Sequence, residues 1–436
     1  MEQYTHMKNS GVNWILDIPA TWGVRVLFQL VEQVKNKNKN LSEQNLLSLS
    51  YGKIKRKDIN NPEGLLPESF DGYNIIEKDD IVLRLTDLQN DHTSLRVGQA
   101  KERGIITSAY TTLRPTGHVN PQYLYYVLHA YDLIKGFYGM GSGVRQGLNY
   151  DEVKTIKVPF PSLEEQQAIV AYLDEQVSQI DFIIEEAKNS IEEYKGWKAS
   201  TIFDALTKGI TSQVEMKDSG IEWIGLIPKT SRIIRLRYLV QDYKAGPFGS
   251  SLITDKLLRE GKILIYTPEH VANKSTDSDK NLYLPEGRKN EMAQFFVKPG
   301  DIIFPIVGSL GRAMMIENEM PEGIINQRLA KFSLRKNKVD PDYFMWAFGK
   351  STFFAPYIDV NRRGSFIVNL TKTIVYDMPF VLPEEISEQK NIALYLDEKC
   401  GTIDTMIEEK EAVISDLEQY KRSLIYEAAT GKRKVV

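Results

Sequence analysis

The side chains of this chain that could do chemistry are forked or paired hydrogen-bond donors gathered in short clusters. The densest basic cluster spans residues 51–57, and Asn326-Gln327-Arg328 joins two amides to a guanidinium. Arginine binds guanine edges, and asparagine or glutamine binds adenine edges, in the major groove of DNA. Lysines, hydroxyls and backbone N–H groups bind phosphates. These residue types therefore predict nucleic-acid contacts.

The candidate contacts fall in both halves of the chain. Those in the first half are Lys53, Lys55, Arg56, Lys57, Arg145 and Gln146, with Arg84, Arg96 and Arg103 as secondary candidates. Those in the second half are Lys244, Phe248, Ser250, His270, Arg312, Asn326, Gln327, Arg328, Arg362, Arg363 and Ser365. A solvated surface group explains any single member equally well, so the prediction rests on the clusters.

The sequence contains no convincing catalytic motif. The glycine-rich run at residues 139–144 lacks the third glycine of a dinucleotide fingerprint, and Gly349-Lys350-Ser351 lacks the upstream glycine of a P-loop. Glu408-Glu409-Lys410 resembles the E-x-K of a nuclease but lies on a helical seam. A methyltransferase box of the type N/D-P-P-Y/F is also absent. We therefore expect a chain that is not an enzyme.

Two long helices are predicted to position these clusters. Ser162 and Glu165 form a capping box, and apolar residues then recur every three or four positions from Ile169 to Tyr194. The pattern returns 223 residues later, with the seam from Leu396 to Ala428. Two seams that neither helix can bury alone predict a coiled-coil-like pair. If the first helix begins again near Ser178, it extends about 45 Å to Thr207 at ~1.5 Å per residue.

A second repeat opens each half. Residues 9–19 read NSGVNWILDIP and residues 218–228 read DSGIEWIGLIP. The chain is thus a tandem duplication with an expected pseudo-two-fold symmetry. Between the opening motif and the helix, each half has an α/β pattern. The expected strands are 46–50, 80–85, 107–113, 263–267, 301–305 and 331–334, and the expected helices are 121–130 and 341–348.

Composition and charge agree with this organisation. The 436 residues are 42% apolar and 26% charged, as in ordinary globular proteins. The helical segments are acidic: residues 158–209 hold 4 basic and 10 acidic residues, and residues 378–436 hold 8 and 12. The other segments have a small net positive charge, +2 over 1–157 and +5 over 210–377. This contrast is compatible with DNA-reading domains on acidic spacers.

The cysteine and histidine content restricts the cellular setting and the metal chemistry. One cysteine, Cys400, cannot form an internal disulfide and fits a reducing compartment, so we expect a cytoplasmic protein. Five scattered histidines predict no structural zinc site. The chain has no apolar run of the roughly 20 residues that cross a bilayer.

The arrangement resembles the specificity subunit (HsdS) of type I restriction-modification systems. The resemblance rests on the opening motifs with Trp14 and Trp223, and on the entries to the helices at residues 158–166 and 378–389. It also rests on the stretches KAGPFGSSL, residues 244–252, and VKPGDII, residues 297–303. The first half lacks the GPFGS stretch, and residues 77–82 read EKDDIV in place of KPGDII.

The resemblance implies an α+β chain with two target recognition domains, each reading half of a split DNA site. The implied divisions are 1–157 and 210–377 for the recognition segments, and 158–209 and 378–436 for the helical spacers. Two modification (methyltransferase) subunits and the restriction (motor-nuclease) subunits would dock on the chain. S-adenosylmethionine, ATP and Mg²⁺ would bind to those partners, and this chain would hold no cofactor.

Two other functions compete with this reading. The first is a coiled-coil interaction scaffold that binds no nucleic acid, and the second is a self-contained restriction enzyme. Steep weakening of DNA binding by salt would separate the first from a DNA reader. The missing methyltransferase signature argues against the second.

Overall fold

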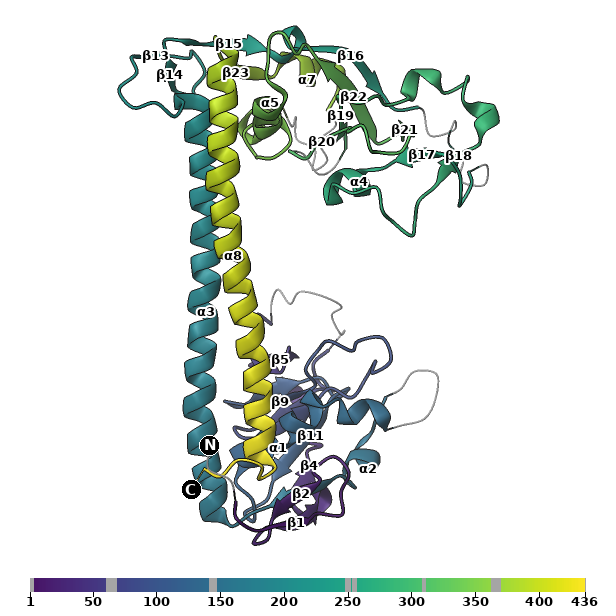
Figure 1. Cartoon of the computed structure of the whole chain (residues 1–436). Coiled ribbons are helices and arrows are strands. Elements are labelled where there is room, and N and C mark those ends of the chain that lie inside the picture. The colour runs from purple at the N-terminus through teal and green to yellow at the C-terminus, as the bar shows by residue number, and fades with distance from the viewer. Residues whose placement is uncertain are drawn as a thin grey trace. The chain divides into compact units, whose positions relative to one another are not determined.

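The computed structural model describes residues 4–59, 69–140, 147–247, 252, 257–307, 311–361 and 370–435. The chain divides into two compact units, one from Met1–Lys188 with Glu411–Val436 and one from Asn189–Lys410. Two long helices, α3 (Leu163–Lys208) and α8 (Ile386–Ala429), each contribute to both units (Figure 1). Each unit therefore joins one recognition segment to part of each long helix. The boundaries implied by the resemblance, at 157/158, 209/210 and 377/378, stay predictions.

Helix α3 is continuous because its sequence has a strong start and no internal stop. Glu165 N donates to Ser162 Oγ at 3.2 Å, and Ser162 N donates to the Glu165 carboxylate at 3.3 Å, which is the predicted capping box. The helix runs through residue 178 without a break, so the restart considered from the sequence does not occur. Gly209 follows the helix with a φ of 76°, a conformation that glycine adopts without strain.

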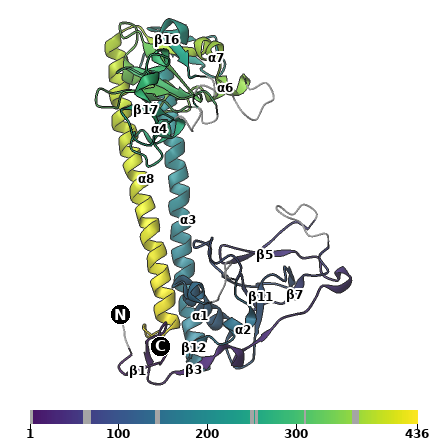
Figure 2. The same ribbon diagram turned by 90° about the vertical axis from the view of Figure 1, so that its right-hand side faces the viewer.

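The portions of α3 and α8 within each unit run antiparallel and side by side (Figures 1 and 2). Lys421 Nζ lies 2.5 Å from Asp181 Oδ1 in the first unit, and Lys198 Nζ lies 2.6 Å from Asp404 in the second. The predicted seams are turned inward. Their buried members are Ile169, Leu173, Ile180, Ile184, Ala187, Ile191, Leu396, Cys400, Ile403, Leu424 and Ala428.

The first unit is a mixed structure of short strands and short helices. Its main sheet has the order β4-β11-β8-β9, and smaller pairs are β1-β2, β3-β12, β5-β6 and β7-β10. The strands are β1 (Met7–Asn9), β2 (Asp17–Pro19), β3 (Gly23–Val26), β4 (Val31–Gln33), β5 (Leu47–Ser50), β6 (Lys53–Arg56), β7 (Asn74–Ile76), β8 (Ile81–Leu83), β9 (Val97–Gln99), β10 (Gly104–Ile106), β11 (Thr111–Pro115) and β12 (Lys157–Phe160). The helices are η1 (Leu27–Gln29), η2 (Lys39–Leu41), α1 (Pro121–Leu133), η3 (Gly136–Gly139) and α2 (Tyr150–Val153).

The second unit follows the same order. Its main sheet is β16-β22-β19-β20, the small pairs are β13-β14 and β15-β23, and a three-stranded sheet β18-β17-β21 is added. The strands are β13 (Met216–Asp218), β14 (Leu226–Pro228), β15 (Ser231–Arg235), β16 (Val240–Ala245), β17 (Ile263–Tyr266), β18 (Tyr283–Leu284), β19 (Asp301–Pro305), β20 (Met314–Met315), β21 (Gly323–Ile325), β22 (Leu329–Leu334) and β23 (Pro379–Pro383). The helices are η4 (Leu236–Tyr238), α4 (Pro268–Asn273), η7 (Glu286–Arg288), η8 (Ala293–Phe295), α5 (Pro341–Phe348), α6 (Ala355–Val360) and α7 (Lys372–Asp377).

A single apolar core joins each recognition segment to the long helices. In the first unit, Leu83 of the sheet, Leu124 of α1, Ile169 of α3 and Leu424 of α8 belong to one buried cluster. The corresponding cluster of the second unit extends from the sheet through α5 to α3 and α8. The helices therefore complete the core of each unit, and a recognition segment without them would expose part of that core to water.

A buried glutamine at the start of each long helix links that helix to its recognition segment through hydrogen bonds. Gln166 is fully buried; its Oε1 accepts from Asn120 N at 2.8 Å, and its Nε2 donates to Pro161 O at 3.0 Å. Gln389 is also fully buried and repeats both bonds, with Asp340 N and Pro383 O. Asn120 and Asp340 are the N-caps of α1 and α5. The glutamine shared by both halves thus sets where α1 or α5 begins.

A tyrosine on α1 and its counterpart on α5 make a second set of equivalent hydrogen bonds in the two units. The Tyr123 hydroxyl lies 3.1 Å from Ala429 O at the end of α8, and the Tyr343 hydroxyl lies 3.5 Å from Leu206 O near the end of α3. Each hydroxyl also bonds to the strand that leads into its own long helix. The sequence duplication is therefore accompanied by equivalent hydrogen bonds between the recognition segment and the long helices in both units.

We predict that Gln166→Ala and Gln389→Ala each destabilise their own unit by about 1–3 kcal/mol, because buried partners lose their hydrogen bonds. Gln167→Ala is the matched control, since Gln167 is exposed beside Gln166. The measurement is urea unfolding followed by circular dichroism. Equal stability of the Gln166 and Gln167 variants would contradict this account.

Candidate nucleic-acid interface

In the second unit, two clusters predicted separately from the sequence lie against each other. Gly246 packs so closely on the turn at Asn326 that an added Cβ would lie 1.9 Å from Asn326 O. Gly246 N also donates to Leu329 O at 2.8 Å, just after Arg328. The turn itself is closed by Asn326 Oδ1, which accepts from Arg328 N at 3.0 Å. Gln327 and Arg328 are exposed on this turn, next to the segment that carries Lys244.

The same turn lies at the end of the parallel strands β17 and β21. Asn326 N donates to Tyr266 O at 3.0 Å, which places the turn beside the start of α4. His270 of α4 is buried: its Nδ1 lies 3.0 Å from Thr267 N and its Nε2 lies 2.8 Å from Asn281 Oδ1. Both ring nitrogens are engaged, so this environment favours a structural role for His270 over a base contact.

Arg312 is exposed and is one of the residues that line an aromatic pocket of the second unit. The pocket has a volume of about 250 Å³ and is lined by Phe304, Phe348 and Phe354. Ile306, which follows β19, donates its N–H to Arg328 O at 2.9 Å. The β19–β20 connection that carries Arg312 therefore starts beside the Asn326–Arg328 turn. This unit thus gathers Lys244, Arg312, Gln327 and Arg328 around neighbouring loops.

In the first unit, the basic cluster 51–57 forms the turn and second strand of the β5–β6 hairpin. Lys53 and Lys55 are exposed, and Tyr51 at the turn is 76% exposed with a φ of 47°. Gly52 packs on Leu95, whose Cβ would lie 3.0 Å from an added Cβ. The hairpin turn therefore lies beside the connection between β8 and β9.

The arginines of this region are partly engaged within the protein. Arg56 binds the carboxylate of Glu102, and Arg103 lies 3.0 Å from Glu43 and 2.7 Å from Glu77. These pairs neutralise much of the charge that the sequence offered, because each arginine has an acidic partner. Lys57 is exposed beyond the end of β6. Arg84 is half-buried, and its Nη1 lies 3.9 Å from Asp91.

Arg96, a secondary candidate from the sequence, is fully buried. Its guanidinium donates to the backbone carbonyls of Thr86, Asp87 and Asp91, and its Nε donates to the Tyr138 hydroxyl at 3.2 Å. A side chain with no exposed surface cannot reach DNA. Arg96 is therefore a structural residue, and its candidacy as a DNA contact is withdrawn.

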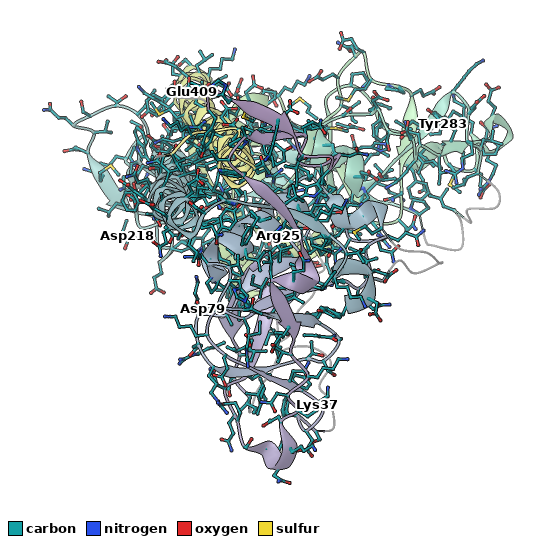
Figure 3. The ribbon with its side chains drawn as sticks, turned by 90° about the horizontal axis from the view of Figure 1, so that it is seen from below. Arg25, Lys37, Asp79, Asp218, Tyr283 and Glu409 are labelled. Atoms are coloured by element: carbon teal, nitrogen blue, oxygen red, sulfur yellow. The ribbon has the colours of Figure 1, made fainter. Side chains whose placement is uncertain are left out.

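A basic segment that the sequence analysis did not single out follows β4. Lys35, Lys37 and Lys39 alternate with asparagines and are exposed. Figure 3 shows Lys37 remote from the long helices and Arg25 nearer to them. Because β4 corresponds to β16, this segment corresponds to the one after Lys244. The alternation of lysine and asparagine was the signal that could have identified it.

The first unit also contains a pocket of about 500 Å³ whose lining comes from several separate segments of the chain. It lies between the hairpin turn, α1 and the long helices, and its lining includes Lys53, Tyr125, His129 and Arg422. Burial lowers the pKa of His129 to about 4, with Lys421 and Arg422 adding to the shift. The ring is therefore neutral at neutral pH.

Seven of the predicted contacts lie outside the described residues. They are Arg145, Gln146, Phe248, Ser250, Arg362, Arg363 and Ser365. Among the residues that the structure describes, no group of histidine, cysteine and acidic side chains is arranged to hold a metal ion. No helix within the described ranges combines the length and apolar character needed to cross a membrane.

We predict that Gly246→Ala destabilises the second unit by about 1–3 kcal/mol, because the new methyl group would overlap Asn326 O and force the two loops apart. Gly287→Ala is the control, since nothing lies within 4 Å of its added Cβ. Thermal unfolding of both variants measures the difference. A Gly246 variant as stable as the Gly287 variant would show that the close approach is not needed.

Comparisons with known proteins agree with the resemblance drawn from the sequence. Residues 19–193 match the type I restriction modification DNA specificity domain. The chain is 23% identical to the MjaVIII specificity subunit of Methanocaldococcus jannaschii, covering 96% of this chain and 95% of that one. It is 24% identical to the putative MjaX specificity subunit of the same organism, covering 99% and 98%.

A solved structure shows the same fold. A chain from a study of complex assembly and conformational transition of the type I R-M system matches with a TM-score of 0.68 at 13% identity, covering 94% of this chain and 98% of that one. The α+β architecture with two long helices is therefore the expected one. The sequence matches show that residues 19–193 resemble the type I restriction modification DNA specificity domain, and that the chain is similar over nearly its whole length to type I restriction enzyme specificity subunits.

Proposed function

We propose that this chain recognises a split DNA sequence, with one part read by each recognition segment and a non-specific gap between them. The observation that carries the proposal is the pair of dissimilar surfaces held by one duplicated scaffold. The hydrogen bonds of Gln166 in the first unit and of Gln389 in the second are equivalent. The β5–β6 hairpin of the first unit and the Asn326–Arg328 turn of the second are not equivalent to each other. Identical supports with different loops suit the reading of two different sequences.

The partners and cofactors follow from the same proposal. The chain would dock two modification subunits and the restriction subunits, and S-adenosylmethionine, ATP and Mg²⁺ would bind to those partners. The acidic helices support a division of tasks in which the helices bind partner subunits and the recognition segments bind DNA. An acidic helix face repels DNA and leaves the duplex to the recognition segments.

The alternative is an interaction scaffold that binds no nucleic acid. The two functions differ in the effect of salt, because binding through phosphates releases counterions and weakens steeply as salt rises. The assay is the affinity of the chain, assembled with its modification partner, for duplex DNA over a salt series. An assembled complex without DNA affinity at low salt would favour the scaffold.

A matched insertion in the long helices tests the split site. One heptad added between Lys188 and Asn189 and another between Lys410 and Glu411 keep the apolar seam in register. Each adds about 10.5 Å of helix, or at most about three base-pair steps. We expect a longer gap with unchanged half-sites, because each long helix has an end in each unit.

The measurement is methylation sequencing of cells that carry the variant with its modification partner. A matched substitution of one exposed heptad, without added length, controls for altered helix surfaces. Changed half-sites with an unchanged gap would rule out a spacer role for the helices.

An exposed apolar pair in each unit supports the docking of two partners. Ile183 and Tyr420 in the first unit are 48% and 42% exposed, and Met406 and Trp197 in the second are 37% and 56% exposed. Ile183 corresponds to Met406, and Trp197 to Tyr420, by the 223-residue repeat. Exposed apolar side chains at equivalent places fit two copies of one modification subunit.

We expect Trp197→Ala with Met406→Ala to remove one modification subunit from the assembly, because only the pair in the second unit is lost. Ile183→Ala with Tyr420→Ala should do the same for the first unit. The mass of the complex by light scattering reports the number bound. Charge reversal of Glu185 and Glu186 tests separately whether the acidic face of the helix takes part in docking. If both alanine variants still bind two modification subunits, the docking surface lies elsewhere.

A further inference from the structure

The connection between β8 and β9, residues 86–95, is held in one shape by buried groups. Arg96 donates to three of its carbonyls, those of Thr86, Asp87 and Asp91. A buried guanidinium is costly unless its donors are satisfied, so this arginine is strongly committed to the loop. The hydroxyl of Tyr138 adds a fourth bond, to Asp91 O at 3.0 Å.

Further contacts leave little freedom in the loop. The Asp91 carboxylate accepts from Ser94 N at 2.9 Å and Thr93 N at 3.2 Å, and the Ser94 bond is the main reason that its pKa lies well below the usual range. Leu88 is fully buried and anchors the middle of the loop in the core. Lys135 Nζ donates to His92 O at 2.6 Å.

This rigid loop presents two amides to solvent. Gln89 and Asn90 are both exposed beside the buried Leu88. Asn90 Nδ2 donates to Asp87 Oδ1 at 2.8 Å, and because a carboxylate only accepts, this bond fixes which end of the amide is the nitrogen. The second N–H and the carbonyl oxygen of Asn90 remain available. This donor and acceptor pair is the one that binds N7 and N6 of adenine.

The position of the loop connects it with the other candidate contacts. Leu95 at its end packs on Gly52, which places the loop beside the basic hairpin turn with Lys53. In the order of strands, the β8–β9 connection corresponds to the β19–β20 connection, which carries Arg312 in the second unit. The exposed lysine of the hairpin and the loop that carries the exposed amides are thus neighbours.

We propose that the loop at residues 86–95 reads bases for the first recognition segment, with Gln89 and Asn90 as its specificity-determining side chains. This inference rests on the proposed function and names residues for it. A loop held before binding loses less conformational freedom on contact with DNA, which favours discrimination by few hydrogen bonds. Arg96 is a positioning residue, since it acts only through the loop.

The test uses the complex of this chain with its modification partner. Gln89→Ala and Asn90→Ala are made separately, and Gln44→Ala, an exposed glutamine beside the Glu43–Arg103 pair, is the matched control. Methylation sequencing first defines the wild-type motif. Each loop variant should then accept other bases at one position of one half-site, and the other half-site and the gap should stay unchanged.

Affinities for a cognate and an unrelated duplex separate base reading from general binding. We expect about a 10-fold to 100-fold loss on the cognate duplex for each loop variant, with unrelated DNA unaffected. An unchanged motif, or equal losses on both duplexes, would overturn the loop assignment. A wild-type complex without any two-part motif would instead count against the proposed function itself.

Discussion

Neither α3 nor α8 can shield its apolar seam from water alone, and the rest of each unit is attached to their pairing. Ile169 and Leu424 lie in the same core as the sheet and α1 of the first unit. The Lys421–Asp181 and Lys198–Asp404 pairs flank this seam at equivalent places, and partly exposed pairs of this kind add about 0–1 kcal/mol each. Burial of the seam, and not these charges, therefore supplies most of the stability.

The candidate DNA-contact surfaces are positioned by close packing and by buried polar groups. Gly246 lets two loops of the second unit touch at backbone level, and in the first unit Arg96 holds the connection between β8 and β9 through three carbonyls. The contacts that hold these loops differ between the two units, although the scaffold that carries the loops is duplicated. Loops fixed by different means can present different side chains without disturbing the shared core.

Charge is divided between the elements in a way that suits the roles proposed for them. The helical segments are acidic and the recognition segments are mildly basic. Within the first unit, Arg56 and Arg103 are neutralised by neighbouring glutamates, whereas Lys53 and Lys55 stay exposed on the hairpin. The effective positive surface of these arginines is therefore smaller than the sequence suggests, and exposed lysines lie both on the hairpin and on the segment after β4.

The sequence alone determined the helices, the duplication and several strands, because heptads, caps and strand alternation are local patterns. Pro341–Phe348 and Asp301–Pro305 have their predicted bounds. Tertiary structure decided which charged groups remain available, because burial and ion pairing depend on residues distant in the chain. It buried Arg96 and His270, joined Gly246 to Asn326, and exposed a loop whose amides carry no sequence signature.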